Sequence, residues 1–186
     1  ESANLSKESG DLAWEASAFY FLGSVYLDIG EYVTSQRFCE KAISVWQNTG
    51  MASCYIMWNI IPLALAKVMN NEKDVNLNEI LKWHEEIKHR WIKGLVLNCI
   101  GKIMLNIDVQ HISEAEDWIK RAIEINEKYG MKWSLARSFV LYAELFKRKG
   151  DLPKAKEKLN TAIEIFKECG ADGWVEKYEK ELAAFL

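Results

Sequence analysis

The sequence predicts an all-α solenoid of antiparallel helix hairpins that ends in a C-terminal capping helix. Two observations lead to this prediction. Glycine recurs at multiples of a 40-residue step, as Gly10, Gly50, Gly130 and Gly170, and Arg90 occupies the remaining slot. The chain has only two prolines in 186 residues, which permits long regular helices. Such arrays typically present a binding surface rather than a buried catalytic pocket.

The sequence around the glycines repeats at the same 40-residue spacing. Residues 41–45 read KAISV, residues 121–125 read RAIEI and residues 161–165 read TAIEI. We therefore divide the chain into four units and a final helix: 11–50, 51–90, 91–130, 131–170 and 171–186. Residues 1–10 resemble the end of a preceding unit, because Ala3-Asn4-Leu5 through Gly10 fills the slot of Ile123-Glu124-Ile125 through Gly130. We expect a single repeat domain that is a fragment of a longer protein.

Each unit reads as two helices that meet at a turn. Gly30 and Gly150 fall where a positive φ would end a first helix. Asp151 and Asn76 are expected to cap the helices that follow them. Ser113 with Glu116 reads as a capping box that opens the second helix of unit three. In unit two no glycine ends the second helix, so we expect it to run into residues 90–91 with little break.

Small side chains recur where paired helices must approach closely. Gly23, Gly101 and Ala143 take this place on first helices, and Ala42, Ala122 and Ala162 share one position on second helices. The last segment places Trp174, Tyr178, Leu182 and Phe185 on one stripe opposite charged residues. A solenoid needs such a helix to cover the apolar face of its final unit.

The pattern Leu22-Gly23-x-x-Tyr26-x-x-x-Gly30-Glu31-Tyr32, followed by Ala42, resembles the tetratricopeptide repeat signature. Residues 142–162 of unit four match it a second time, while Ser35 replaces the expected alanine in unit one. Longer units of this kind resemble the arrays attached to bacterial and archaeal signalling ATPases, nucleotide cyclases and transcriptional activators. The resemblance implies a right-handed superhelix whose first helices line a concave groove. HEAT-type repeats, at about 40–47 residues, are the alternative fold.

Composition and spacing offer little support for catalysis. His84 and His89 are five residues apart, whereas two zinc ligands on one helix face are four apart. The sequence contains no glycine-rich phosphate loop, and its net charge of −3 does not suggest nucleic-acid binding. The most apolar run, residues 55–69, is too short to span a bilayer. We expect no cofactor and no metal, four reduced and mostly buried cysteines, and a cytoplasmic location.

The resemblance implies which side chains face the groove. They lie one position past core residues of the first helices and mix aromatic, amide and charged groups. The expected partner-binding residues are Tyr20, Ser24, Asp28, Trp58, Asn98, Lys102, Arg137, Glu144 and Arg148. This set suits an extended peptide with some acidic character. Joint charge reversal of Lys102, Arg137 and Arg148 is expected to abolish binding while sparing the fold.

The leading hypothesis is a non-catalytic scaffold or regulatory module of a multidomain signalling protein. It would bind a protein, a peptide or another domain of its own chain, and neither nucleic acid nor membrane. The alternative is a small-molecule-sensing array with its ligand near Trp58 and Tyr20. An enzyme is the third hypothesis. The oligomeric state stays open.

Overall fold

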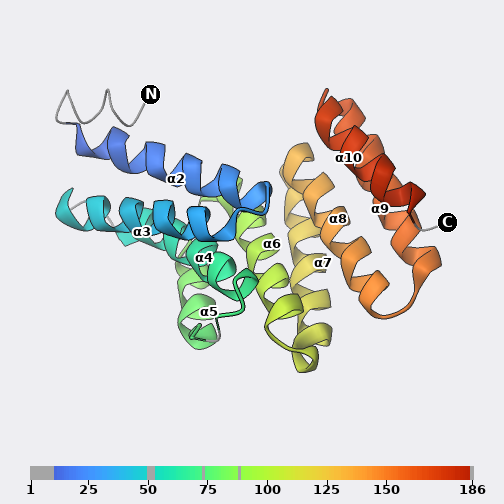
Figure 1. Ribbon diagram of the computed structural model, residues 1–186, viewed down its shortest axis with the longest axis horizontal. Helices are drawn as coiled ribbons and strands as arrows, with labels where there is room; N and C mark the ends of the chain where they lie inside the picture. Colours follow the sequence, from blue (N-terminus) through green and yellow to red (C-terminus); the bar gives the residue numbers. More distant parts are fainter. Residues whose placement is uncertain (1–10, 50–52, 73, 88, 185–186) are drawn as a thin grey trace. The chain divides into compact units, whose positions relative to one another are not determined.

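The computed structural model describes residues 11–49, 53–72, 74–87 and 89–184, and these are almost entirely α-helical. Consecutive helices pair as hairpins, as the sequence predicts (Figure 1). The chain divides into two compact units, residues 1–87 and 88–186, and each unit is described by itself.

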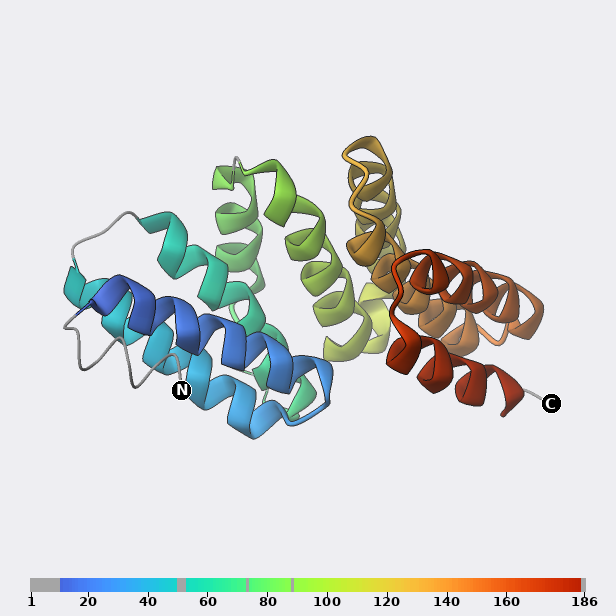
Figure 2. The ribbon, with the colours of Figure 1, turned by 90° about the horizontal axis from the view of Figure 1, so that it is seen from above.

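Among the residues that the structure describes, the first unit holds four helices. They are α2 (Leu12–Asp28), α3 (Tyr32–Thr49), α4 (Ser53–Met69) and α5 (Leu77–Glu86). The α2 and α3 helices lie side by side along their length, and α4 packs on α3 (Figure 2). The most apolar run of the sequence, residues 55–69, lies in α4, which buries Ile61, Ala66 and Val68. In the part of the chain that the structure describes, no helix is long and apolar enough to cross a membrane.

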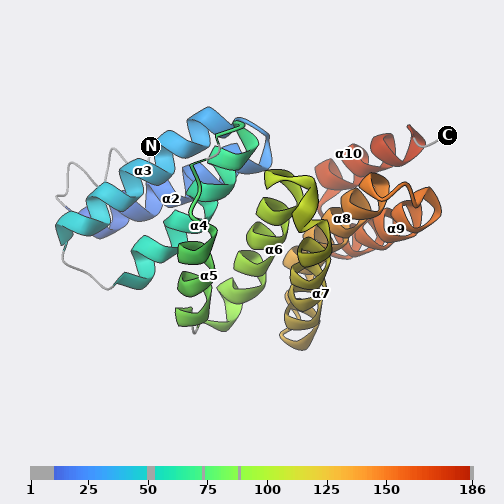
Figure 3. The ribbon, with the colours of Figure 1, turned by 90° about the horizontal axis from the view of Figure 1, so that it is seen from below.

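The second unit holds two further hairpins and the final helix. They comprise α6 (Arg90–Ile107), α7 (Ile112–Lys128), α8 (Lys132–Arg148), α9 (Leu152–Glu168) and α10 (Asp172–Ala183). A short 3₁₀ helix, η1 (Val109–His111), joins α6 to α7. The α6 helix pairs with α7 and also contacts α8, so the two first helices of this unit are neighbours (Figure 3).

The predicted glycine turns are confirmed at four positions. Gly30, Gly130, Gly150 and Gly170 have φ between 64° and 86°, which L-residues with side chains rarely adopt. After each glycine, the next backbone N–H bonds back to the last turn of the helix; Asp151 N, for example, donates to Phe146 O at 2.9 Å. The predicted turn glycines Gly10 and Gly50 lie outside the described residues.

The close helix contacts also follow the prediction. A Cβ built on Gly23 would lie 2.9 Å from Cys39 Sγ, so only glycine lets α2 approach α3 this closely. Ala42, Ala122 and Ala162 are completely buried at one recurring position. Ser35, which replaces the expected alanine, is also buried, and its hydroxyl donates to Gly23 O at 2.8 Å. The backbone of the facing helix thus satisfies this added polar group.

Two predicted helix boundaries are wrong. The α7 helix does not open with a Ser113–Glu116 capping box, because the Asp108 carboxylate accepts hydrogen bonds from Gln110 N and His111 N and starts η1 earlier. The α5 helix also does not run on into residues 90–91. It ends at Glu86, and Ile87 takes an extended conformation before α6 begins. The predicted caps at Asn76 and Asp151 are both confirmed.

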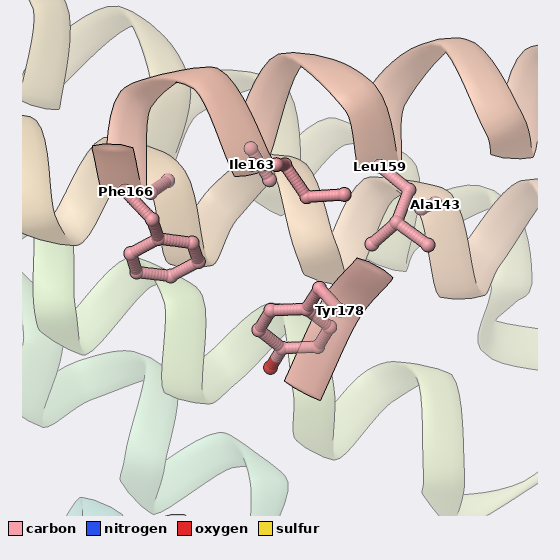
Figure 4. Packing of buried hydrophobic residues seen from close by; sticks show 7 residues of the cluster. Ala143, Leu159, Ile163, Phe166 and Tyr178 are labelled. Carbon is pink, nitrogen blue, oxygen red and sulfur yellow. The ribbon is translucent and has the colours of Figure 1, made fainter. Parts of the chain in front are cut away.

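The final helix covers the end of the second unit, as predicted. Phe166 of α9 is completely buried, and its ring stacks on Trp174 and Tyr178 at centroid distances of 5.6 and 5.7 Å. In Figure 4 the Tyr178 ring lies next to Leu159, Ile163 and Phe166, and its hydroxyl points away from them. Leu182 packs on the same cluster, and Phe185 of the predicted stripe lies outside the described residues.

The cysteine prediction needs one correction. Cys39 and Cys99 are buried among helix contacts, but Cys169 is exposed at the end of α9. Its position as the C-cap residue, followed by Gly170, places it in a turn rather than between helices. The side chain of Cys54 lies outside the described residues.

Candidate interaction surface

The residues expected to bind a partner all lie on first helices. Tyr20, Ser24 and Asp28 are on α2, and Trp58 is on α4, all within the first unit. The second unit contributes two members on α6 and three on α8, namely Asn98, Lys102, Arg137, Glu144 and Arg148. The expected set therefore forms two separate groups, one in each unit.

The group in the first unit is half-buried. The Ser24 hydroxyl donates to Tyr20 O at 3.0 Å, one turn back on its own helix. The Trp58 ring meets Tyr55 edge to face at a centroid distance of 5.0 Å, and Tyr55 stacks on Trp46 at 4.5 Å. These contacts make Trp58 part of the aromatic packing between α3 and α4. The contacts of Trp58 and Ser24 described here are thus internal to the unit.

In the second unit, the expectation that Asn98 projects into a groove is wrong. Asn98 is buried, and its side-chain N–H donates to Ser134 O of α8 at 3.2 Å. The carbonyl of Ser134 also accepts the Ser138 hydroxyl at 3.0 Å. Asn98 therefore helps to join α6 to α8 and is not available on the surface.

Arg148 is exposed, but its guanidinium is committed to contacts within the unit. It donates to Leu105 O, to Asn106 Oδ1 and to Glu144 Oε1, each at 2.6 Å. Leu105 and Asn106 end α6, whereas Glu144 lies one turn back on α8. The arginine side chain therefore joins the last turn of α6 to the last turn of α8, and it donates to a backbone carbonyl at the C-terminal end of α6.

Lys102 lies between these two anchoring points. Asn98, Lys102 and Asn106 follow at four-residue intervals on α6, so they share the face that points to α8. Lys102 is half-buried, and its ammonium forms no ion pair with any residue that the structure describes. The carboxylate of Glu144 is already held by Arg148. Lys102 thus supplies a cation that this face leaves without a counter-charge.

We call the surface formed by Lys102, Asn106, Arg137, Glu144 and Arg148 the α6–α8 face. Arg137 is half-buried on α8, eleven residues before Arg148, which places both on the same side of the helix. The Asn106 amide donates to Lys102 O at 2.7 Å and accepts from Arg148, so its orientation is fixed. This arrangement presents positive charge and backbone-anchored amides, and it suits recognition of a carboxylate-bearing chain.

The sequence reasoning missed a buried polar network beneath this face. Asn126 of α7 is buried and donates to the Ser138 hydroxyl at 3.0 Å. Gly94 of α6 packs directly on it, since a Cβ there would lie 1.9 Å from Asn126 Oδ1. The one available signal was Gly94 itself, a glycine that falls outside the 40-residue step.

A second missed feature is an ionic cluster between α7 and α8. Glu116 forms ion pairs with Lys120, at 2.7 Å, and with Lys149, and it accepts the Tyr142 hydroxyl at 3.2 Å. The hydrogen bonds from Lys120 and Lys149 lower the pKa of Glu116 from 4.5 to about 2. Burial, followed by the charge of Glu116, raises the pKa of Tyr142. Sequence spacing assigned Glu116 to a helix start and gave no sign of Tyr142 and Lys149, its partners from outside α7.

Among the residues that the structure describes, no group of three or more histidine, cysteine, aspartate or glutamate side chains is placed to hold a metal ion. Trp46 is buried, and Trp174 packs on the α9 cluster.

Comparison with known proteins agrees with this hairpin architecture. The sequence matches none of the curated proteins with which it was compared. Residues 16–45, which run from α2 into α3, match the tetratricopeptide repeat family.

A crystal structure of a Signal Transduction ATPase with Numerous Domains from Pyrococcus horikoshii, a protein with a tetratricopeptide repeat sensor, is similar at a TM-score of 0.52 and 19% identity. The similarity covers 90% of this chain and 26% of that one, so this chain spans about a quarter of that protein. At this identity the likeness is one of fold. The chain therefore has a tetratricopeptide-like helical-repeat fold.

Proposed function

We propose that this chain is a non-catalytic regulatory module whose α6–α8 face binds an acidic segment of another protein or of another domain in its own polypeptide. Helical repeats of this kind serve protein interaction, and their extended surfaces suit elongated ligands. The observation that carries the proposal is Lys102, a half-buried cation without a carboxylate partner among the described residues. The similar ATPase, whose tetratricopeptide region is termed a sensor, supports a regulatory role.

Partial burial of Lys102 favours an anionic partner. Holding a cation partly away from water is costly unless an anion or several acceptors compensate for the lost hydration. Among the described residues no carboxylate forms an ion pair with Lys102, and Glu144 on the same face is held by Arg148. A carboxylate from a partner would complete the site and would form a charge-assisted hydrogen bond. At a partly exposed position such a contact contributes on the order of 1–2 kcal/mol, or roughly 5–30-fold in Kd.

The neighbouring groups determine what kind of ligand fits. Asn106 and Arg148 fix the end of the face near the last turns of α6 and α8, and Arg137 adds positive charge about 16 Å along α8 from Arg148 at the ordinary helical rise of 1.5 Å per residue. Charge spread over this length favours an extended peptide with two or more separated acidic residues. A compact anion would reach only one of these positions.

The test is a peptide array of 12-residue segments that range from strongly acidic to strongly basic. We expect the protein to retain the acidic peptides and Lys102→Met to lose most of this retention. Lys82→Met is the matched control, since Lys82 is an exposed lysine on α5 of the first unit. Equal retention by Lys102→Met and the unmodified chain, or retention that does not depend on peptide charge, would contradict the proposal.

A further inference from the structure

The α6–α8 face continues along α8 to the first turn of that helix. At 100° per residue, four residues of α8 fall within about 60° of one another around the helix: Trp133, Arg137, Glu144 and Arg148. Trp133 is 38% exposed, and its ring meets that of Trp174 edge to face at a centroid distance of 5.3 Å. Since Trp174 belongs to α10, the face reaches the final helix at Trp133.

The repeat shows which residue of α10 corresponds to Arg137. A step of 40 residues carries Arg137 onto Lys177 and Ser138 onto Tyr178. Ser138 and Tyr178 are both buried, at 0% and 7% exposure, so the step agrees with the structure. Lys177, one position before the buried Tyr178, is exposed. The α10 helix therefore presents a cation at the position that Arg137 holds on α8.

The ammonium of Lys177 lies over two aromatic rings instead of beside a carboxylate. Its Nζ is 4.9 Å from the centroid of Trp174 and 5.4 Å from that of Tyr178. Glu181 lies one turn further along α10, yet Lys177 forms no ion pair with it or with any other residue in the described part of the chain. The rings hold the cation in place without neutralising it, so its N–H donors can reach an anion.

We propose that α10 is part of the recognition surface and that Lys177 binds a second acidic residue of the segment held at the α6–α8 face. This inference rests on the function proposed above. The segment runs along α8 from the Lys102 end, and the exposed ring of Trp133 offers an apolar contact where it passes to α10. Twelve extended residues span up to about 40 Å, more than the roughly 22 Å between Arg148 and Trp133 along α8.

The test is isothermal titration of a 12-residue acidic peptide retained by the array, together with variants in which each acidic residue in turn is replaced by its amide. Lys177→Met is expected to weaken binding of the parent peptide by about two- to fivefold, as loss of an exposed charge contact does. Lys177→Arg keeps the charge and the ring contact and should retain the affinity. The peptide variant that no longer responds to Lys177→Met should differ from the one that no longer responds to Lys102→Met.

Lys128→Met is the matched control, since Lys128 of α7 also lies over an aromatic ring, that of Tyr129, at 5.6 Å. An unchanged dissociation constant in Lys177→Met, or a change no larger than that in Lys128→Met, would overturn the role of Lys177. Coupling of Lys177 and Lys102 to the same acidic residue would also overturn it. If Lys102→Met still weakens binding in these cases, the function proposed for the α6–α8 face stands without α10. If neither substitution matters, or the array retains no acidic peptide, both proposals fail.

Discussion

Arg148 and Lys102 carry the same charge on neighbouring helices but have different roles. Arg148 donates to the Leu105 carbonyl, to Asn106 and to Glu144, whereas Lys102 forms no ion pair with a described residue. Arg148→Met should therefore lower the free energy of unfolding by on the order of 1–2 kcal/mol, because it leaves acceptors without donors. Lys102→Met should change it by less than about 0.5 kcal/mol. Urea denaturation of the two variants measures this difference.

If Lys102→Met lowered the free energy of unfolding more than Arg148→Met does, Lys102 would have a structural role. The contacts of Arg148 also mean that joint charge reversal of Lys102, Arg137 and Arg148 would disturb the fold together with any binding. Single substitution at Lys102 avoids this complication.

Gly94 and Gly173 offer a matched pair of helical glycines. A Cβ at Gly94 would lie 1.9 Å from buried Asn126 Oδ1, whereas a Cβ at Gly173 would meet no described atom within 4 Å. We expect Gly94→Ala to destabilise the chain by about 1–3 kcal/mol through overpacking. Gly173→Ala should be neutral or stabilise it by up to about 1 kcal/mol, since alanine favours the helix. A Gly94→Ala chain as stable as the unmodified protein would show that Asn126 moves aside without loss.

The Glu116 cluster predicts a pH dependence. The pKa of Glu116 is lowered to about 2 by Lys120 and Lys149, and an unfolded chain returns it to its usual value near 4.5. Its contribution to stability is therefore present above about pH 4.5 and is lost as the pH falls toward 2. The difference in unfolding free energy between the protein and Glu116→Gln should shrink over this interval. A difference that stays constant from pH 7 to pH 2 would contradict the role given to these ion pairs.

At the scale of elements, the α10 helix protects the α9 face beneath it. Truncation after Gly170 removes Trp174 and Tyr178 from Phe166, which is completely buried in the intact chain. The truncated protein should bind a hydrophobic dye and unfold at a lower urea concentration, because its last hairpin then exposes an apolar face. A truncated chain with unchanged midpoint and no dye binding would show that α10 does not contribute to the core.

The elements differ in how well the sequence predicted them. Turns at Gly30 and Gly150 were predictable because a positive φ has a strong residue preference. The start of α7 was not predictable in this way. Ser113 with Glu116 fits the capping-box pattern, but the Asp108 carboxylate accepts hydrogen bonds from the backbone of η1, which precedes α7. Competition between two local capping groups depends on the path of the loop, which residue spacing does not specify.

At the scale of the whole molecule, the 40-residue step predicted the helical hairpins of both units. The repeat spacing predicts the hairpins because equivalent positions are buried in each of them, such as Ala42 and Ala162. The candidate site was less predictable. The sequence identified the helices that carry it, but the burial of Asn98 and the internal contacts of Arg148 arise from partners 36 to 43 residues away. The spacing of residues within one helix does not predict such contacts between helices.

The central claim is that Lys102 is the recognition charge of the α6–α8 face, and a charge swap tests it most directly. The probe is an acidic peptide retained by the array, together with a counterpart in which its acidic residues are replaced by lysine. Isothermal titration of both peptides with the protein and with Lys102→Glu gives four dissociation constants. We predict that Lys102→Glu weakens binding of the acidic peptide by roughly tenfold or more and strengthens binding of the lysine peptide. Four constants that do not depend on the residue at position 102 would contradict the claim.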